Sequence, residues 1–272
     1  MLLGIGSYTY GWSSGCYGSN TSQQADFTYL TAYDLIDRAV QLDVPIVQIC
    51  VKPDLIGLHD EDLRILRNYA DTNDKALEIG TIGSAPEHLD RFLHIAEVLG
   101  AKLVRTIFTS ASPGLIDERN HILQIADGFA EKQITLAIEN HEAASVLDLQ
   151  ALCQDMDNDY VGVCLDTVNS LGRGEGLREV TAALMPFTKC LHIKDFTVVR
   201  HTSDMEMTIT GAPAGEGKLD IPTQLQMLHG VQPDASVVLE QWVPLYESLE
   251  KTVQIQDMWA ENGIKYLKRH IC

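Results

Sequence analysis

Short apolar runs rich in β-branched residues alternate with segments of helical periodicity along the whole chain of 272 residues. Eight of these runs are strand candidates, at residues 2–6, 46–51, 77–81, 102–107, 134–139, 161–166, 190–194 and 236–240. Strands that alternate with helices form parallel βα units, and eight such units at this length match a closed barrel better than an open sheet. We therefore expect an α/β protein with a single (β/α)8 TIM barrel over residues 1–272, since no linker or change of composition divides the chain.

The segments between the strands carry apolar residues at helical spacing. Leu89 and Leu93 belong to such a segment, which predicts a helix that begins near Pro86. A second pattern predicts a helix over residues 245–267 that is interrupted near Asn262 and Gly263. The longest segment without a clear pattern covers residues 195–219, and we expect it to form a loop over the mouth of the barrel.

Composition restricts the partners. The 38 acidic residues exceed the 20 basic ones and give a net charge of -18, which disfavours binding to the phosphate backbone of a nucleic acid. No window approaches the roughly 20 apolar residues of a membrane span, and the first residues do not resemble a signal peptide. We expect a cytoplasmic protein with no membrane partner, whose six scattered cysteines are reduced thiols. A homodimer or a homotetramer is compatible with the sequence.

Acidic residues and a histidine stand at the ends of four successive strands. Glu139, Asp166 and Glu240 end the fifth, sixth and eighth runs, and His192 lies in the seventh. One such residue is usually a solvated strand end, a helix cap or a hydrogen-bonded core histidine, but four in succession would share one space at the mouth of a barrel. Three carboxylates would repel one another there without a cation. The set predicts one divalent metal ion, with Mn²⁺ expected first and Mg²⁺, Co²⁺ or Zn²⁺ as alternatives.

Further side chains near the same strand ends are candidate substrate contacts. Lys194 shares the strand face of His192, so it could pair with a carboxylate or bind an anionic group, unless it is an ordinary surface lysine. Trp242 follows Glu240 at the same spacing. The other candidates are aromatic residues after the first strand, which could stack on a sugar or pack in the core, and polar residues just beyond strands: Tyr10, Trp12, His141 and Asn169.

Several motifs, in this order and spacing, resemble the xylose isomerase-like TIM barrel superfamily of sugar isomerases, epimerases and related lyases. They are "LAIENH", "CLDTVNSLG", "LHIKDF", "GAPAGEGKLDIP" and "VVLEQW". The resemblance implies that Glu139, Asp166, His192 and Glu240 hold one divalent metal and that the two glutamates act as acid and base. It also implies that Glu216, between two glycines, lies near the substrate.

The chain differs from two branches of this superfamily, the epimerases and the DNA-repair endonucleases, at residues near the site. Many epimerases of the superfamily have a histidine three residues after the aspartate that corresponds to Asp166, where this chain has Asn169. The DNA-repair endonuclease branch uses additional histidines at earlier strand ends, and the third strand here ends in "EIGTIGS" without one.

The leading functional hypothesis is a metal-dependent isomerase or epimerase of a small carbohydrate, which acts through an enediolate. Glu139 and Glu240 would remove and return the proton. The alternative is a lyase that takes carbon dioxide from a 3-oxo sugar acid or water from a ketopolyol, because the same enolate forms. The opening "GIGSYTYGWSSG" resembles the 3-oxo-isoapionate decarboxylase-like branch. Two other classes stay open: an aldolase in which Lys194 forms a Schiff base, and a sugar-binding barrel without catalysis.

Overall fold

Eight parallel strands close into a barrel in the computed structural model, which describes residues 1–18, 27–109, 115–156, 158–202 and 206–271. The barrel strands are β1 (Leu2–Gly6), β2 (Ile46–Cys50), β3 (Ala76–Gly80), β4 (Leu103–Ile107), β5 (Thr135–Glu139), β6 (Val161–Asp166), β7 (Thr188–Ile193) and β10 (Ser236–Leu239). They are hydrogen-bonded in the order β1-β10-β7-β6-β5-β4-β3-β2, which closes on β1. The predicted TIM barrel is confirmed, and each strand lies within two residues of its expected position.

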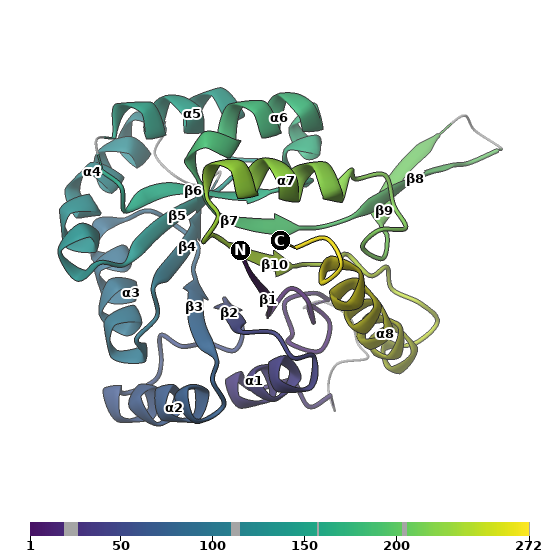
Figure 1. Ribbon diagram of the computed structural model, residues 1–272, viewed down its shortest axis with the longest axis horizontal. Helices are drawn as coiled ribbons and strands as arrows, with labels where there is room; N and C mark the ends of the chain where they lie inside the picture. The colour runs from purple at the N-terminus through teal and green to yellow at the C-terminus, as the bar shows by residue number, and fades with distance from the viewer. Residues whose placement is uncertain (19–26, 110–114, 157, 203–205, 272) are drawn as a thin grey trace.

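Helices surround the barrel on the outside (Figure 1). The α-helices are α1 (Ala32–Gln41), α2 (Asp60–Thr72), α3 (Pro86–Leu99), α4 (Leu115–Lys132), α5 (Val146–Asp155), α6 (Leu177–Leu184), α7 (Ile221–Val231) and α8 (Leu249–Leu267), with short 3-10 helices η2 (Asn169–Arg173) and η3 (Met185–Phe187). Helix α3 begins at Pro86 as expected. Within the described parts of the chain, no helix is both long and apolar enough to cross a membrane.

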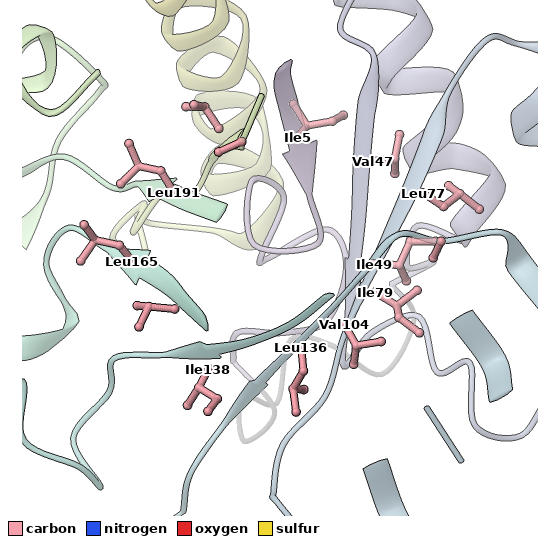
Figure 2. Packing of buried hydrophobic residues seen from close by; sticks show 14 of the residues in the cluster. Ile5, Val47, Ile49, Leu77, Ile79, Val104, Leu136, Ile138, Leu165 and Leu191 are labelled. Atoms are coloured by element: carbon pink, nitrogen blue, oxygen red, sulfur yellow. The ribbon is translucent and has the colours of Figure 1, made fainter. Parts of the chain in front are cut away.

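Alternate residues of each strand face opposite sides of the barrel wall, so the strands contribute to two separate cores. The larger core packs the outward residues of the strands against the helices, and Figure 2 shows Ile5, Val47 and Leu136 among them. The smaller core fills the barrel interior with inward residues: Ile46, Leu103, Ala137, Cys164, Cys190 and Val238. The inward side of the wall also carries the polar groups of the site.

Helix α8 continues through Gly263, so the predicted interruption near Asn262 is wrong. A glycine inside a helix usually weakens it. Here the glycine allows close packing, because a Cβ atom at position 263 would lie 2.9 Å from the Cδ2 atom of Leu239 in β10. The residue that suggested a break is therefore the one that lets α8 pack tightly on the barrel.

The segment 195–219 is not an irregular loop throughout, contrary to expectation. It forms an antiparallel hairpin of β8 (Phe196–Arg200) and β9 (Met207–Gly211), which projects away from the barrel (Figure 1). Alternating β-branched residues such as Val198 and Ile209 pair across it. Residues 203–205 lie outside the described part of the chain.

The rest of this segment is held by the buried carboxylate of Asp195. It accepts backbone hydrogen bonds from Gly215 at 2.9 Å, Gly217 at 3.0 Å and Leu219 at 3.0 Å. Position 217 requires glycine, because a Cβ atom there would lie 2.1 Å from the Oδ1 atom of Asp195. The "GEGKL" sequence is thus a turn wrapped around one aspartate.

Replacing Asp195 with alanine should destabilise the protein by roughly 3 kcal/mol, because several backbone N–H groups lose a charged acceptor inside the protein. Urea unfolding measures this loss, and hydrogen exchange should become faster at Gly215 to Leu219. As a control, Asp220→Ala removes only the cap of α7 and should cost about 1 kcal/mol. Equal losses for the two variants would contradict this account of the turn.

Candidate metal centre and active site

Four side chains predicted as metal ligands meet at one end of the barrel. Glu139 ends β5, Asp166 ends β6, His192 is the penultimate residue of β7, and Glu240 directly follows β10. Because parallel strands all point their C-terminal ends to the same side, these residues share the mouth of the barrel. Each is at most 3% exposed, so their charges interact with little screening by water.

The His192 imidazole lies among these carboxylates. Its Nδ1 atom is 3.1 Å from Glu240 Oε1 and 3.5 Å from Glu139 Oε2. Burial lowers the pKa of His192, but the carboxylates of Glu240 and Glu139 raise it more strongly, to about 10. The two carboxylates therefore favour the protonated form of the imidazole at neutral pH.

Lys194 supplies a second positive charge to the mouth. Its Nζ atom lies 2.9 Å from Asp166 Oδ2 and 2.9 Å from Glu240 Oε2, and it donates a 3.3 Å hydrogen bond to Asn169 Oδ1. Burial lowers the pKa of this amine, but Asp166 and Glu240 raise it well above its ordinary value. Such surroundings favour the ammonium form and do not favour a Schiff-base nucleophile, which must be a neutral amine.

Arg105 is a third cation of the site, and it was not among the site residues predicted from the sequence. It projects from β4, forms an ion pair with Glu139 and donates from Nη1 to the Thr81 carbonyl at 3.3 Å. Its guanidinium also lies over the Tyr8 ring, 5.8 Å from the centroid. The signal in the sequence was a charged residue in the middle of the apolar strand "LVRTI".

The glutamates are both held by cations. Burial raises the pKa of Glu240, but the positive charges of His192, Lys194 and Arg105 have the larger opposite effect and lower it to about 2. Glu139 accepts from Arg105 and receives a 2.7 Å hydrogen bond from Asn169 Nδ2. Asn169 thus connects Glu139 to Lys194 through the two polar atoms of its amide.

A cavity of about 230 Å³ opens directly beside these groups. It is lined by charged, polar and aromatic residues together with one isoleucine and one glycine: Tyr8, Tyr17, Arg105, Ile107, Glu139, His141, Glu142, Asn169, Gly172, Lys194, Glu240 and Trp242. Lys194 Nζ lies 5.4 Å from the centroid of the Trp242 ring. The volume suits a small polar molecule of sugar size.

Three residues expected at the substrate lie elsewhere. Tyr10 is buried in the larger core, and the guanidinium of Arg38 lies over its ring. Trp12 packs against Val243, and its indole N–H donates a hydrogen bond to the Val243 carbonyl. Both therefore follow the alternative of core packing. Glu216 is exposed in the turn around Asp195 and is not among the residues that line the cavity. The aromatic residues that do reach the cavity from this part of the chain are Tyr8 and Tyr17.

The side chains at the mouth fit a divalent cation. Ligand atoms of Glu139, Asp166 and His192 lie within 4.8 Å of one another. Among the described residues, His192 Nδ1 and Asp166 Oδ2 are buried without a hydrogen-bond partner, although ionic partners lie near both. Such atoms are suited to bind an ion, and the combination of carboxylate oxygens with one imidazole suits Mn²⁺ or Mg²⁺, with Co²⁺ and Zn²⁺ also compatible.

Comparison with known proteins identifies the family. A family model described as xylose isomerase-like TIM barrel matches residues 36–270, so the chain belongs to this family. A 3-oxo-isoapionate decarboxylase from Pectobacterium atrosepticum is 28% identical over 269 residues, which cover 98% of this chain and 95% of that protein. The expectation of an enzyme of this superfamily is confirmed.

Solved structures share the fold at lower identity. A D-psicose 3-epimerase in the presence of D-fructose has a TM-score of 0.72 at 16% identity, with 100% of this chain and 99% of that chain covered. A xylose isomerase-like TIM barrel protein from Mycobacterium smegmatis in complex with magnesium has a TM-score of 0.71 at 15% identity, with 97% of each chain covered. The metal ligands, the substrate and the homodimer or homotetramer stay predictions for this chain.

Binding of Mn²⁺ at this site should release close to one proton per ion at pH 7. The reason is that the pKa of His192 is raised to about 10, so the imidazole is protonated at pH 7 and must lose its proton before it can bind a metal. Affinity should therefore fall as the pH is lowered. Calorimetric titration in two buffers of different ionisation enthalpy gives the number of protons released.

The variant His192→Gln tests whether the proton released on Mn²⁺ binding comes from His192. Glutamine does not titrate, so the variant should bind Mn²⁺ more weakly and release no proton from position 192. Proton release by His192→Gln equal to that of the native protein would assign the proton to another group and contradict the prediction.

Proposed function

We propose that this protein is a divalent-metal-dependent lyase that releases carbon dioxide from a 3-oxo sugar acid through an enediolate. The observation that carries the proposal is the presence of two buried cations, Arg105 and Lys194, in the wall of the cavity that also contains Glu139 and Glu240. With a divalent ion bound and His192 neutral, the positive charges outweigh the three buried carboxylates. Glu142 lies at the exposed rim, where water screens its charge. Such a cavity attracts an anionic substrate.

The similarity to a 3-oxo-isoapionate decarboxylase supports the same substrate class, since it extends over 98% of this chain. A neutral sugar would leave the two cations of the cavity without a new partner. A sugar acid brings a carboxylate that can accept from Arg105, whose bonds to Glu139 and Thr81 leave further N–H groups for a ligand.

The proposed metal ligands are Glu139, Asp166, His192 and Glu240. When bound, the ion would act as a Lewis acid that polarises the 3-oxo group. Loss of carbon dioxide breaks the bond between the carboxylate carbon and its neighbour, and the electron pair of that bond moves toward the adjacent carbonyl to give the enediolate. The ammonium group of Lys194 is the candidate donor of the proton that the carbon then takes up, because it lies in the cavity wall in its protonated form.

The remaining residues of the cavity would orient the substrate and limit access of water. Asn169 and His141 offer hydrogen bonds to hydroxyl groups, and the rings of Trp242, Tyr8 and Tyr17 offer apolar surface to the carbon skeleton. Asn169 is already tied to Glu139 and Lys194, so a hydroxyl bound there would be held close to both groups.

A metal-dependent isomerase or epimerase of a small sugar is the second candidate. It is favoured by Glu139 and Glu240, which line the same cavity and could act as an acid and base pair. The two functions share the enediolate and differ in what leaves the carbon.

One experiment separates them. The Mn²⁺-loaded protein is incubated in D2O with 3-oxo sugar acids, ketoses, ketose phosphates and ketopolyols, while carbon dioxide release and hydrogen exchange at carbon are followed. We expect carbon dioxide from a 3-oxo acid, with one deuterium in the product. Exchange or epimerisation of ketoses without carbon dioxide release would support the second candidate and reject the decarboxylase.

Replacing Arg105 with methionine should reduce turnover of the acidic substrate by roughly 100- to 1000-fold, the usual effect of removing one charged group that stabilises a reacting anion. Mn²⁺ should bind as tightly as before or more tightly, because a cation that competes for Glu139 has been removed. These opposite effects distinguish lost recognition of the anion from a damaged fold. Turnover and calorimetric metal affinity measure them.

Arg38→Met is the matched control for this change. Arg38 also lies over a tyrosine ring and pairs with an acid, Asp257, but it packs beside Tyr10 away from the cavity. Its replacement should leave turnover within about twofold, as expected for a distant partly exposed ion pair. Native turnover by Arg105→Met would reject a role for Arg105 in binding the substrate.

A further inference from the structure

A buried chain of hydrogen bonds crosses the barrel interior and ends on His192. His192 Nε2 lies 2.8 Å from Gln48 Oε1, and Gln48 Nε2 donates to Glu78 Oε2 at 2.9 Å. Gln48 and Glu78 are paired neighbours on β2 and β3, whereas His192 is on β7, on another side of the barrel. The exposed fractions are 1% for Gln48, 7% for Glu78 and 0% for His192, so these groups depend on one another for hydrogen bonds.

The orientation of the Gln48 amide follows from its neighbours. The amide nitrogen faces the Glu78 carboxyl group and the Cys190 thiol, which is 3.5 Å away. The amide oxygen accepts from the Cys50 thiol at 3.3 Å and faces the imidazole. A flipped amide would turn its nitrogen toward the Cys50 thiol and lose the hydrogen bond that its oxygen accepts there.

This orientation determines which nitrogen of His192 carries a proton. A carbonyl oxygen only accepts, so Nε2 must be the donor of the 2.8 Å hydrogen bond. Nδ1 is the nitrogen that faces Glu139 and Glu240. A neutral His192 therefore presents its lone pair to the carboxylates and keeps its proton toward Gln48.

We propose that Gln48 and Glu78 are positioning residues that hold His192 in the Nε2–H tautomer and aim Nδ1 at the metal. The inference rests on the proposed metal site. Glu78 orients the amide, the amide orients the imidazole, and the acceptor on Nε2 makes Nδ1 a better ligand. As a result, the orientation and tautomer of His192 are determined by residues of β2 and β3, across the barrel, and not by the loop that follows β7.

The tautomer can be observed without any variant. In ¹⁵N-histidine spectra of the metal-free and the Mg²⁺-loaded protein, we expect a slowly exchanging Nε2–H of His192 in both samples, and an Nδ1 without a proton in the Mg²⁺-loaded sample. A proton on Nδ1 and a bare Nε2 in the Mg²⁺-loaded sample would overturn the proposal.

Variants then test whether the hydrogen bonds from Glu78 through Gln48 to His192 matter for metal binding. Gln48→Leu should weaken Mn²⁺ binding by roughly 10- to 100-fold, the usual effect of removing a hydrogen-bond partner of a histidine ligand, and should abolish the protected Nε2–H signal. Glu78→Gln keeps an acceptor for the Gln48 amide and should retain both properties, whereas Glu78→Leu should weaken binding. If Gln48→Leu does not fold, the comparison of Glu78→Gln with Glu78→Leu provides the same test.

Gln224→Leu is the matched control, because this buried glutamine bonds to Thr181 between α6 and α7, away from the site. It should bind Mn²⁺ like the native protein. Equal affinity of Gln48→Leu and Gln224→Leu, with an unchanged Nε2–H signal, would overturn the proposal. If no sugar acid is decarboxylated, the proposed function fails, but metal affinity and the Nε2–H signal still report on Gln48 and Glu78.

Discussion

Three buried carboxylates cannot remain ionised side by side unless positive charge lies among them, and this constraint organises the mouth of the barrel. Glu139 is paired with Arg105, Asp166 with Lys194, and Glu240 with both Lys194 and His192. Arg105 projects from β4 and His192 from β7, and Lys194 directly follows β7. The site is therefore preorganised before a metal or a substrate arrives, and an incoming ion has to compete with side-chain cations for the same oxygens.

The alternation of side chains across the wall explains how one strand serves stability and chemistry together. Outward residues of β5 pack against the helices, while Ala137 and Glu139 face inward. On β2, Ile46 fills the interior core and Gln48, two residues later, contacts His192. Apolar contacts thus hold the wall from both sides and leave a short polar layer whose positions are defined by the barrel itself.

Much of the fold and part of the site could be predicted because their signals repeat. Eight apolar runs and four polar strand ends reinforce one another, whereas Arg105 and Gln48 are single polar residues within apolar strands, and a single residue does not reveal its partners across the barrel. The alternation placed Lys194 and Trp242 correctly at the cavity. The same alternation does not predict side-chain directions after the first strand, because the chain there is no longer a regular strand. Tyr8 lines the cavity, whereas Tyr10 is buried in the larger core.

The surroundings of the two glutamates also bear on the choice between the candidate reactions. Epimerisation requires a carboxylate that is free to take a proton from carbon, and both oxygens of Glu240 face cations, Oε1 toward His192 and Oε2 toward Lys194. Decarboxylation needs no such base, since the departing carbon dioxide leaves its electron pair behind. It needs positive charge near the developing enediolate and a donor for the final proton, and Lys194 can serve both needs. The same ion pairs that stabilise the buried carboxylates thus favour the lyase reaction at this site.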